Sequence, residues 1–310
     1  MIKLMKTKEN RIVPIAEIEK GCWVNVSNPD PDELKTLSMN LNIPLDFFTD
    51  SLDIDERSRI ETENHTIFFL LRVPSFNKGN VDVPYTTLPV GIILSNDIIV
   101  TVCTSDIGEI LDLFNSRIKN ISTENRNRFI LHLFLRTAFL YLKYLKDINK
   151  KSAEVETELQ KSMKNEALIK LLNIEKSLVF FTTSLRANDL MMERLQKIKG
   201  FNLNEDDQDL LEDVIVDNKQ AIEMANIYSN ILSGMMDAFA SVISNNLNIV
   251  MKFLTSVTII LMLPTLVASI YGMNVNLPFQ HSPHAFFITI GISLLLSIAG
   301  VLIFLKNRWF

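Results

Sequence analysis

Polar residues and methionines recur at helical spacing within one of the two most apolar segments of this 310-residue chain. They follow one another at alternating steps of three and four residues, on one face of a helix: Asn248, Met251, Thr255, Thr258, Met262, Thr265 and Ser269. A single Ser or Thr in a membrane usually bonds to its own backbone or to a neighbouring helix. Several on one stripe favour the wall of a water-filled path, which two spans cannot enclose without further copies of the chain.

A second group of residues is acidic and lies earlier in the chain. Residues 203–217 contain seven carboxylates and no Lys or Arg. Four of the acids fall on one helical face: Asp206, Asp209, Asp213 and Asp217. These carboxylates repel one another, which favours a functional role for this face. The alternative is a solvated helix start, where acids complement the helix dipole.

Residues 253–271 and 285–305 carry no charge, and each run of about 20 residues is long enough to cross a hydrocarbon core of roughly 30 Å. We therefore predict a first transmembrane helix over 251–271, an external loop over 272–284, a second transmembrane helix over 285–305 and a basic tail over 306–310. Lys252, Lys306 and Arg308 flank the spans, whereas the loop has no Lys or Arg. Both termini are thus expected in the cytosol. The first residues lack the apolar core of a secretory signal, which favours the same orientation.

The residues before the spans divide into a strand-rich and a helical part. The runs CWVNV, HTIFFLLRV, TTLPVGIIL and DIIVTVCT and the helical stretch PDELKTLSMNL predict a mixed α/β domain over 1–120. No proline occurs between Gly91 and Leu263, and helical periodicity predicts a long helix pair over 121–203. A stalk helix follows over 204–250, with Asn204 as its N-cap and no stop before the first span. The expected fold class is an α+β membrane protein whose stalk helix continues into the first transmembrane helix.

The stalk carries a seam at steps of three and four residues: Leu211, Val214, Asn218, Ala221, Ala225, Tyr228, Leu232, Met235, Phe239, Val242 and Asn246. A period of 3.5 residues favours a left-handed supercoil with other helices, in which Asn218 and Asn246 would set register and copy number. The alternative is that this face packs on the protein's own helices. Both can hold on different sides of one helix.

The connector ASIYGMNVNLPF, residues 268–279, lies between the spans and has no charged residue. Its tetrapeptide Tyr271-Gly272-Met273-Asn274 resembles the signature of the CorA family of divalent-cation channels. The segment NIVMKFLTSVTIILMLPTLVASIYGMN is similar to the family's pore helix, and the tail KNRWF and the order of the domains resemble the family over essentially the whole chain. The resemblance implies a homopentamer that passes magnesium ions through the cytoplasmic membrane.

The resemblance also implies roles for single residues. Gly272, Met273 and Asn274 would form the outer mouth, where neutral oxygens meet the hydrated ion without trapping it. Further in, it implies a polar ring of Asn248, a narrow ring of Thr255 and a hydrophobic constriction of Met251, Leu254 and Met262, with Thr258 on the same pore-lining stripe. Family members bind cytosolic magnesium between protomers through a stalk Asp, which matches Asp213. Internal magnesium would relieve the repulsion of the acidic face and hold the pentamer closed.

Two features depart from the family pattern. Its usual Met-Pro pair occurs one residue later, as Leu263 and Pro264, and the connector has His281 and His284 in place of acidic residues. Two histidines three residues apart could bind zinc, although exposed interface residues are the preferred interpretation. Cys22 and Cys103 lack the spacing of a metal motif and are expected to be small buried residues of a reducing compartment.

The sequence contains no phosphate-binding glycine loop, no metalloprotease helix and no nucleophile beside a histidine, so no enzyme and no organic cofactor is expected. The predicted partners are further copies of the chain, the lipid bilayer and divalent cations, without nucleic acid. Passive magnesium transport is the first of three hypotheses for the function. The second hypothesis is a relative that transports zinc, cobalt or nickel, and the third is a membrane-anchored scaffold or sensor without conduction.

Overall fold

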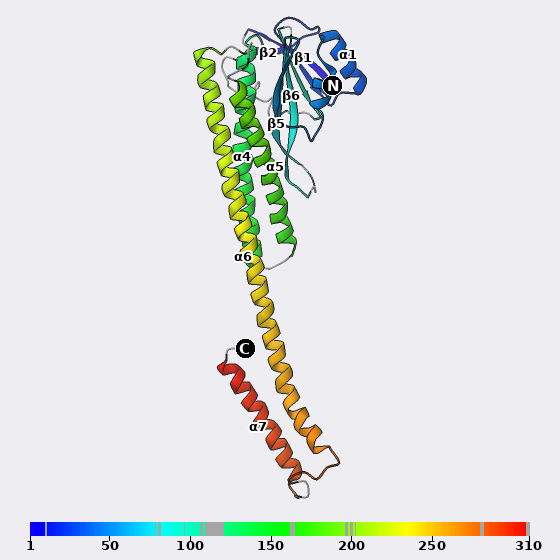
Figure 1. The fold of residues 1–310 in the computed structure, drawn as a ribbon, viewed down its shortest axis with the longest axis vertical. Helices are drawn as coiled ribbons and strands as arrows, with labels where there is room; N and C mark the ends of the chain where they lie inside the picture. The colour runs from blue at the N-terminus through cyan, green and yellow to red at the C-terminus, as the bar shows by residue number, and fades with distance from the viewer. Residues whose placement is uncertain are drawn as a thin grey trace. The chain divides into compact units, whose positions relative to one another are not determined.

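The computed structural model describes residues 1–307 apart from 10, 78, 80, 81, 96, 106, 107, 109–120, 162–164, 196, 197, 199, 200, 202, 280 and 281. His281 and Arg308 therefore lie outside the described residues. The chain forms two compact units, Met1–Gly234 and Met235–Phe310. Helix α6, Glu205–Tyr271, begins in the first unit and ends in the second without interruption (Figure 1).

The first unit contains a seven-stranded sheet in the order β2-β1-β3-β7-β6-β5-β4. Neighbouring strands are antiparallel except β3 and β7, which are parallel. The strands are β1 Ile2–Lys8, β2 Arg11–Pro14, β3 Cys22–Ser27, β4 Arg59–Glu63, β5 Thr66–Phe76, β6 Tyr85–Ser95 and β7 Ile98–Cys103. The edge strands are short and carry Arg and Glu, which blunts their unpaired backbone against association with other chains.

Both faces of the central strands are buried. Side chains alternate across a strand, so Phe68 and Leu70 of β5 point to one core while Phe69 and Leu71 point to the other. Helices α1, Pro31–Leu41, and α2, Leu45–Asp50, cover the first face. Burial on both sides explains why β5 to β7 read as nearly continuous apolar runs.

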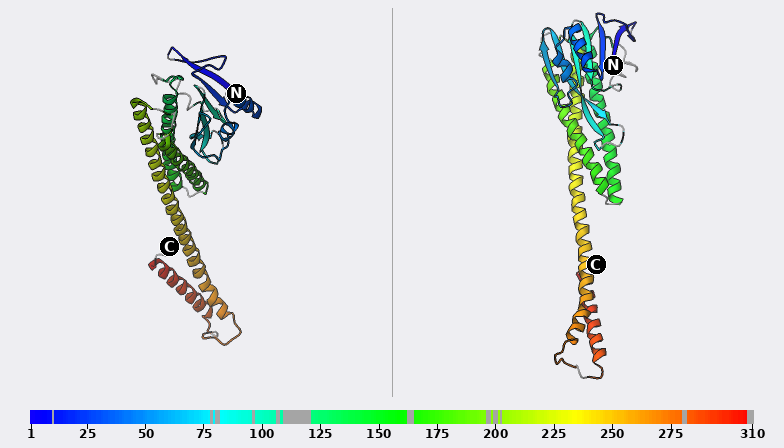
Figure 2. Two further views of the ribbon diagram at one scale, coloured as in Figure 1. Left: turned by 45° about the horizontal axis from the view of Figure 1, so that its top comes forward. Right: turned by 90° about the vertical axis from the view of Figure 1, so that its right-hand side faces the viewer.

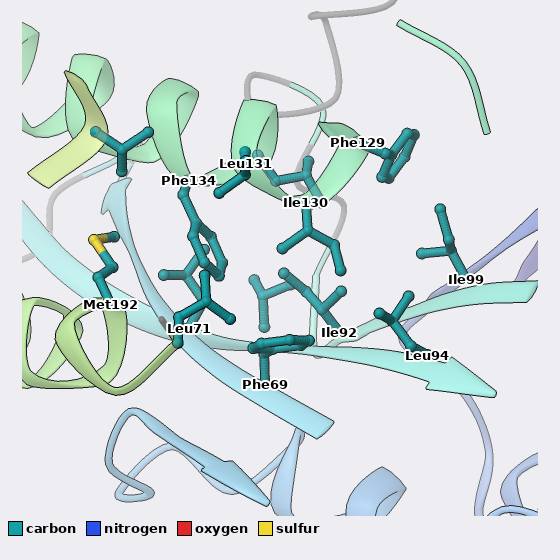
Figure 3. Packing of buried hydrophobic residues seen from close by; sticks show 14 of the residues in the cluster. Phe69, Leu71, Ile92, Leu94, Ile99, Phe129, Ile130, Leu131, Phe134 and Met192 are labelled. Carbon is teal, nitrogen blue, oxygen red and sulfur yellow. The ribbon is translucent and has the colours of Figure 1, made fainter. Parts of the chain in front are cut away.

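The second face of the sheet is covered by α4, Arg126–Lys161, α5, Asn165–Leu195, and the first part of α6. Figure 3 shows Phe134 and Met192 from these helices packed against Phe69 and Leu71 of the sheet. Figure 2 shows the three helices side by side in this unit. The predicted N-cap of α6 is confirmed, because the backbone N–H of Asp207 donates to Asn204 Oδ1 at 2.8 Å.

The second unit contains the remainder of α6 and helix α7, Ala285–Lys306. Both helices are long and apolar enough to cross a membrane. Pro264 lies inside α6 and lacks the N–H that would bond to the carbonyl four residues earlier, yet the helix continues to Tyr271. The predicted fold class is therefore confirmed: an α/β domain, a long helix pair, and a long helix that leads into the first of two apolar helices.

Candidate ion pathway and cation-binding face

Helix α7 packs on one face of α6 only. Ser256 is fully buried and Val267 is 6% exposed, and a Cβ built on Gly300 of α7 would lie 3.2 Å from Leu263 Cδ1 and 3.7 Å from Ile260 Cγ1. Residues 256, 260, 263 and 267 follow at steps of four and three, so they form one face of α6. A glycine on α7 allows the two helices to approach closely there, as small residues do between membrane helices.

The predicted polar stripe lies on the opposite face of α6. Each of its seven residues is exposed: Asn248, Met251, Thr255, Thr258, Met262, Thr265 and Ser269. Leu254, which is predicted for the constriction, lies on the same side and is 57% exposed. The other two constriction residues, Met251 and Met262, are 53% and 63% exposed. The structure therefore brings all the predicted pore-lining residues to one uncovered face, away from α7.

Two threonines of the stripe bond to their own helix. Thr258 Oγ1 donates to Leu254 O at 2.8 Å, and Thr265 Oγ1 donates to Leu261 O at 3.1 Å. This backbone bonding is the ordinary role that single intramembrane hydroxyls play. It uses the hydroxyl hydrogen and leaves the oxygen lone pairs able to accept hydrogen bonds from water.

The predicted mouth residues lie where α6 ends. The N–H of Gly272 donates to Ala268 O at 2.9 Å and the N–H of Met273 donates to Ile270 O at 3.2 Å, so the helical bonding stops here. A Cβ on Gly272 would lie 3.2 Å from Ala268 O, closer than a side chain ordinarily sits. Met273 and Asn274 are exposed. This end of the helix thus offers carbonyl and amide oxygens without any charge.

The connector after the predicted mouth residues folds back on the end of α6. Tyr271 Oη donates to Pro278 O at 3.4 Å, and Phe279 has a left-handed backbone, φ 65°. His284 precedes α7 and is exposed. Because His281 is outside the described residues, the expectation that His281 and His284 are exposed interface residues rather than zinc ligands is not tested for the pair.

The four predicted cation-binding acids lie on the first part of α6. Asp206, Asp209 and Asp213 are exposed and Asp217 is half-buried. Burial, together with the nearby Asp213 carboxylate, raises the pKa of Asp217. A positive charge near this pair would therefore be favourable, since it would offset the repulsion between two ionised carboxylates.

An arginine from another helix lies beside the start of the acidic face, although residues 203–217 themselves contain no Lys or Arg. Arg128 of α4 places Nη1 3.8 Å from Asp207 Oδ1 and 4.0 Å from Asp206 Oδ2. Asp209, Asp213 and Asp217 have no Lys or Arg nitrogen within 4.0 Å in the described part of the chain. The uncompensated charge is thus concentrated on the later three acids. Within the described residues, no group of three or more His, Cys, Asp or Glu of one chain forms a metal site.

The seam on the first part of α6 packs against the protein's own helices. Leu211, Val214, Ala221 and Ala225 are fully buried and Leu232 is 1% exposed. Asn218 Nδ2 donates to Leu185 O of α5 at 3.1 Å. The intrachain alternative is therefore confirmed from Leu211 to Leu232, and the prediction that Asn218 sets copy number is wrong, because its amide is used within the chain.

An α/β domain joined through a long helix to two apolar helices, the first with an exposed polar stripe, defines a membrane transport protein with two spans per chain. The family model described as CorA-like Mg2+ transporter protein matches residues 19–307. The chain belongs to this family, which is a family of transporters and not of enzymes.

Related proteins and solved structures agree with this assignment. The cobalt/magnesium transport protein CorA of Methanocaldococcus jannaschii is 28% identical over 292 residues, covering 93% of this chain and 90% of that protein. The magnesium transport protein CorA of Helicobacter pylori is 23% identical over 297 residues, with the same two coverages of 93% and 90%. The complete structure of the Methanocaldococcus jannaschii CorA magnesium transporter matches with a TM-score of 0.85 and 25% identity, covering 100% of this chain and 99% of that one. The full-length CmaX protein shares the fold at a TM-score of 0.71 and 14% identity, covering 100% and 98%.

Two features of the site were not predicted from the sequence. Arg128 lies about 80 residues before the acids that it contacts, and no local pattern connects them. The approach of Gly300 to α6 had a detectable signal, since small residues recur along the second span at Thr289, Ser293, Ser297 and Gly300.

Proposed function

We propose that this chain forms a homopentamer that passes magnesium ions across the cytoplasmic membrane, down their electrochemical gradient. The observation that carries the proposal is the uncovered polar stripe of α6, which lies opposite α7 and leads to an exposed, uncharged helix end at Gly272–Asn274. In a single chain this stripe would place hydroxyl and amide groups against lipid, which is unfavourable. Several copies of α6 around an axis would instead enclose the stripes as the wall of a pore.

The mouth residues suit a hydrated ion. Magnesium has six oxygen ligands and loses its water slowly, so a fast site should contact the hydration shell. The amide oxygen of Asn274 and the backbone carbonyls at Gly272 and Met273 accept hydrogen bonds from coordinated water. Residues 253–305 contain no Asp or Glu, so the ion meets no carboxylate that would hold it.

The constriction would lie deeper along the stripe. Met251, Leu254 and Met262 are exposed on the stripe side, and rings of such side chains close a pore by excluding water. Asn248 and Thr255 would contribute polar rings beside them. With both termini in the cytosol, the negative-inside potential favours cation entry by about 2.3 kcal/mol per charge per 100 mV.

Gating would use the acidic face. Among the described residues, no Lys or Arg nitrogen lies within 4.0 Å of Asp209, Asp213 or Asp217, and burial together with Asp213 raises the pKa of Asp217. Cytosolic magnesium bound between these acids and a neighbouring copy would remove the repulsion and stabilise the closed pentamer. When internal magnesium falls, the repulsion returns and the pore opens.

A second candidate is transport of cobalt, zinc or nickel by the same pore. It is favoured by the printed name of one relative, a cobalt/magnesium transport protein, and by the neutral mouth, which discriminates poorly among divalent hydrated ions. A non-conducting scaffold is a third candidate, but it gives no reason for the exposed polar stripe.

The test is ion flux into liposomes that contain the purified protein, with magnesium, cobalt, zinc and nickel compared at equal concentration. Asn274→Ala should abolish most of the magnesium flux, because a single preorganised polar contact contributes about 1–3 kcal/mol, or roughly tenfold or more in rate. Asn276→Ala, an exposed amide in the same connector, is the matched control and should conduct as wild type does. Equal flux in both variants would remove Asn274 from the mechanism, and a native mass of only one or two chains in mild detergent would exclude the pentamer.

A further inference from the structure

A groove of about 450 Å³ lies in the first unit between α5 and the segment that enters β4. Its wall contains four arginines and an apolar patch: Arg57, Arg59, Arg186, Arg194, Leu190 and Met191. The volume lies in the range of pockets that bind small molecules. The proposed ion pathway and the acidic face use none of these residues.

One of the four arginines is neutralised. Arg59 forms ion pairs with Asp50 at 2.6 Å, with Glu61 at 2.5 Å and with Glu56. Its guanidinium also lies 5.7 Å from the centre of the Phe68 ring. Arg59 is therefore a structural cation of the sheet edge, and its charge is not available to a ligand.

The other three arginines have no such compensation. Within the described residues, no carboxylate oxygen lies within 4.0 Å of Arg57, Arg186 or Arg194, and all three side chains are exposed. Arg186 and Arg194 are eight residues apart on α5, with Leu190 between them on the same helical face. Arg57 faces them from the other wall of the groove. Three like charges around one groove repel one another unless an anion lies between them.

The two walls of the groove are joined by hydrogen bonds of Asn188. Asn188 of α5 is fully buried, and its Nδ2 donates to Arg72 O at 2.8 Å. Its Oδ1 accepts from Ser58 Oγ at 2.6 Å and from the Arg72 N–H at 3.1 Å. One side chain thus holds both walls of the groove to strand β5, so Arg57 and α5 keep their spacing before any ligand arrives. A preorganised site of this kind costs a ligand little reorganisation energy.

We propose that this groove binds a polyphosphate anion. Guanidinium groups bind phosphate oxygens through two parallel N–H···O bonds, and three of them match an anion that carries several negative charges along a short chain. Leu190 is 60% exposed beside the arginines and offers apolar surface to an organic group attached to the phosphates. Inorganic tripolyphosphate and a nucleoside triphosphate share this chemistry and differ only in that organic group.

The groove is connected to α6 through one of its arginines. Arg186 Nη2 donates to Asn226 Oδ1 of α6 at 3.3 Å. An anion that engages both edges of the Arg186 guanidinium competes with this bond. Binding of the anion therefore weakens a direct link between α5 and the stalk part of α6, which makes the anion an effector of this helix packing.

The experiment is calorimetric titration of the full-length protein in detergent with sodium tripolyphosphate and, separately, with ATP. Excess chelator and about 150 mM salt are present throughout, so neither probe acts by removing magnesium, and weak surface attraction is screened. Both probes should bind the wild-type protein. The double variant Arg57→Gln with Arg194→Gln should bind at least tenfold more weakly, and Arg11→Gln, an exposed arginine on β2, should bind as wild type. Thermal unfolding without ligand verifies that each variant is folded.

The remaining outcomes identify the source of the ligand or overturn the proposal. Tighter binding of ATP than of tripolyphosphate supports a nucleotide seated over Leu190, and equal binding supports the phosphate chain alone. Asn226→Ala should tighten binding by two- to fivefold, because the competing bond is removed. The proposal is overturned if neither probe binds at this salt concentration, or if the double variant binds as well as wild type.

Discussion

Two stretches of helix α6 carry the same spacing of residues and use it differently. From Leu211 to Leu232 the seam is buried against α5 and the sheet core within the chain. From Asn248 to Ser269 the stripe is exposed, and α7 occupies the opposite face. A pattern with steps of three and four shows that a face needs a partner, but it does not show which chain supplies the partner. The proposal of an assembly therefore depends on the second stretch.

The largest expected effect is a difference in the free energy of unfolding between variants in the two stretches. Leu211→Ala removes a fully buried side chain and should lower the free energy of unfolding by about 2–5 kcal/mol. Met262→Ala removes an exposed one, and its effect should stay within about 0.5 kcal/mol. Denaturant unfolding in detergent, followed by far-ultraviolet circular dichroism, measures both, since each unit contains part of the long helix α6. Equal losses in the two variants would contradict the distinction.

A second effect concerns how accessible the residues of the stripe are to water. Thr258→Cys should react with a charged, water-soluble thiol reagent at least about tenfold faster than Ser256→Cys, whose position is fully buried. Leu295→Cys on α7 is the control for lipid exposure: it is 66% exposed in the single chain, and in the proposed pentamer this face of α7 contacts lipid, which a charged reagent does not enter. The native Cys22 and Cys103 are buried, and burial raises the pKa of both thiols, so background labelling is low. Fast labelling of Leu295→Cys would argue against the assigned lipid face.

A third effect concerns the acids on the first stretch. Replacing Asp206, Asp209, Asp213 and Asp217 together by Asn removes both the repulsion and the proposed ligands for internal magnesium. The magnesium concentration that protects the stalk region from protease should rise by about tenfold or more, corresponding to at least about 1.4 kcal/mol of lost binding. Glu223→Gln, an exposed acid elsewhere on α6, is the matched control and should keep wild-type protection. Full protection in the quadruple variant would make these acids a solvated helix face.

The smallest effect is a pH dependence. Burial and Asp213 raise the pKa of Asp217 above its ordinary value in the unfolded chain. The folded state therefore binds the proton more tightly, and stability falls as pH rises from the ordinary Asp pKa through the raised one. Asp217→Asn should increase the melting temperature at neutral pH, and its advantage over wild type should disappear as the pH falls into the ordinary Asp range. An advantage that does not change with pH would assign the effect to packing.

Burial explains which parts of the fold were predictable. The interior strands β5, β6 and β7 were predicted because burial on both faces makes their sequences continuously apolar. Strand β4, with the sequence RIETE, could not be predicted in this way, because an edge strand with an exposed charged face lacks a continuous apolar run. The short helix α2 was missed for a related reason, since six residues are too few to show a helical period.

The candidate site also has a part that the sequence predicts and a part that it does not. Helical spacing alone predicted the stripe from Asn248 to Ser269, because all its members lie on one regular element. The hydrogen-bond partner of Asn218 and the pairing of Arg128 with Asp206 could not be predicted, since each depends on which helix packs beside α6. Such contacts are tertiary, and local patterns do not encode them.

The continuity of α6 restricts how the gene can change in length. A helix turns by about 100° per residue, so one inserted or deleted residue near Gly234 would rotate every later side chain by that angle relative to every earlier one. Seven inserted residues would nearly restore the angular phase and lengthen the helix by about 10 Å. Viable insertions and deletions in this helix should therefore cluster at multiples close to three, four and seven residues, whereas surface loops of the α/β domain should accept any length.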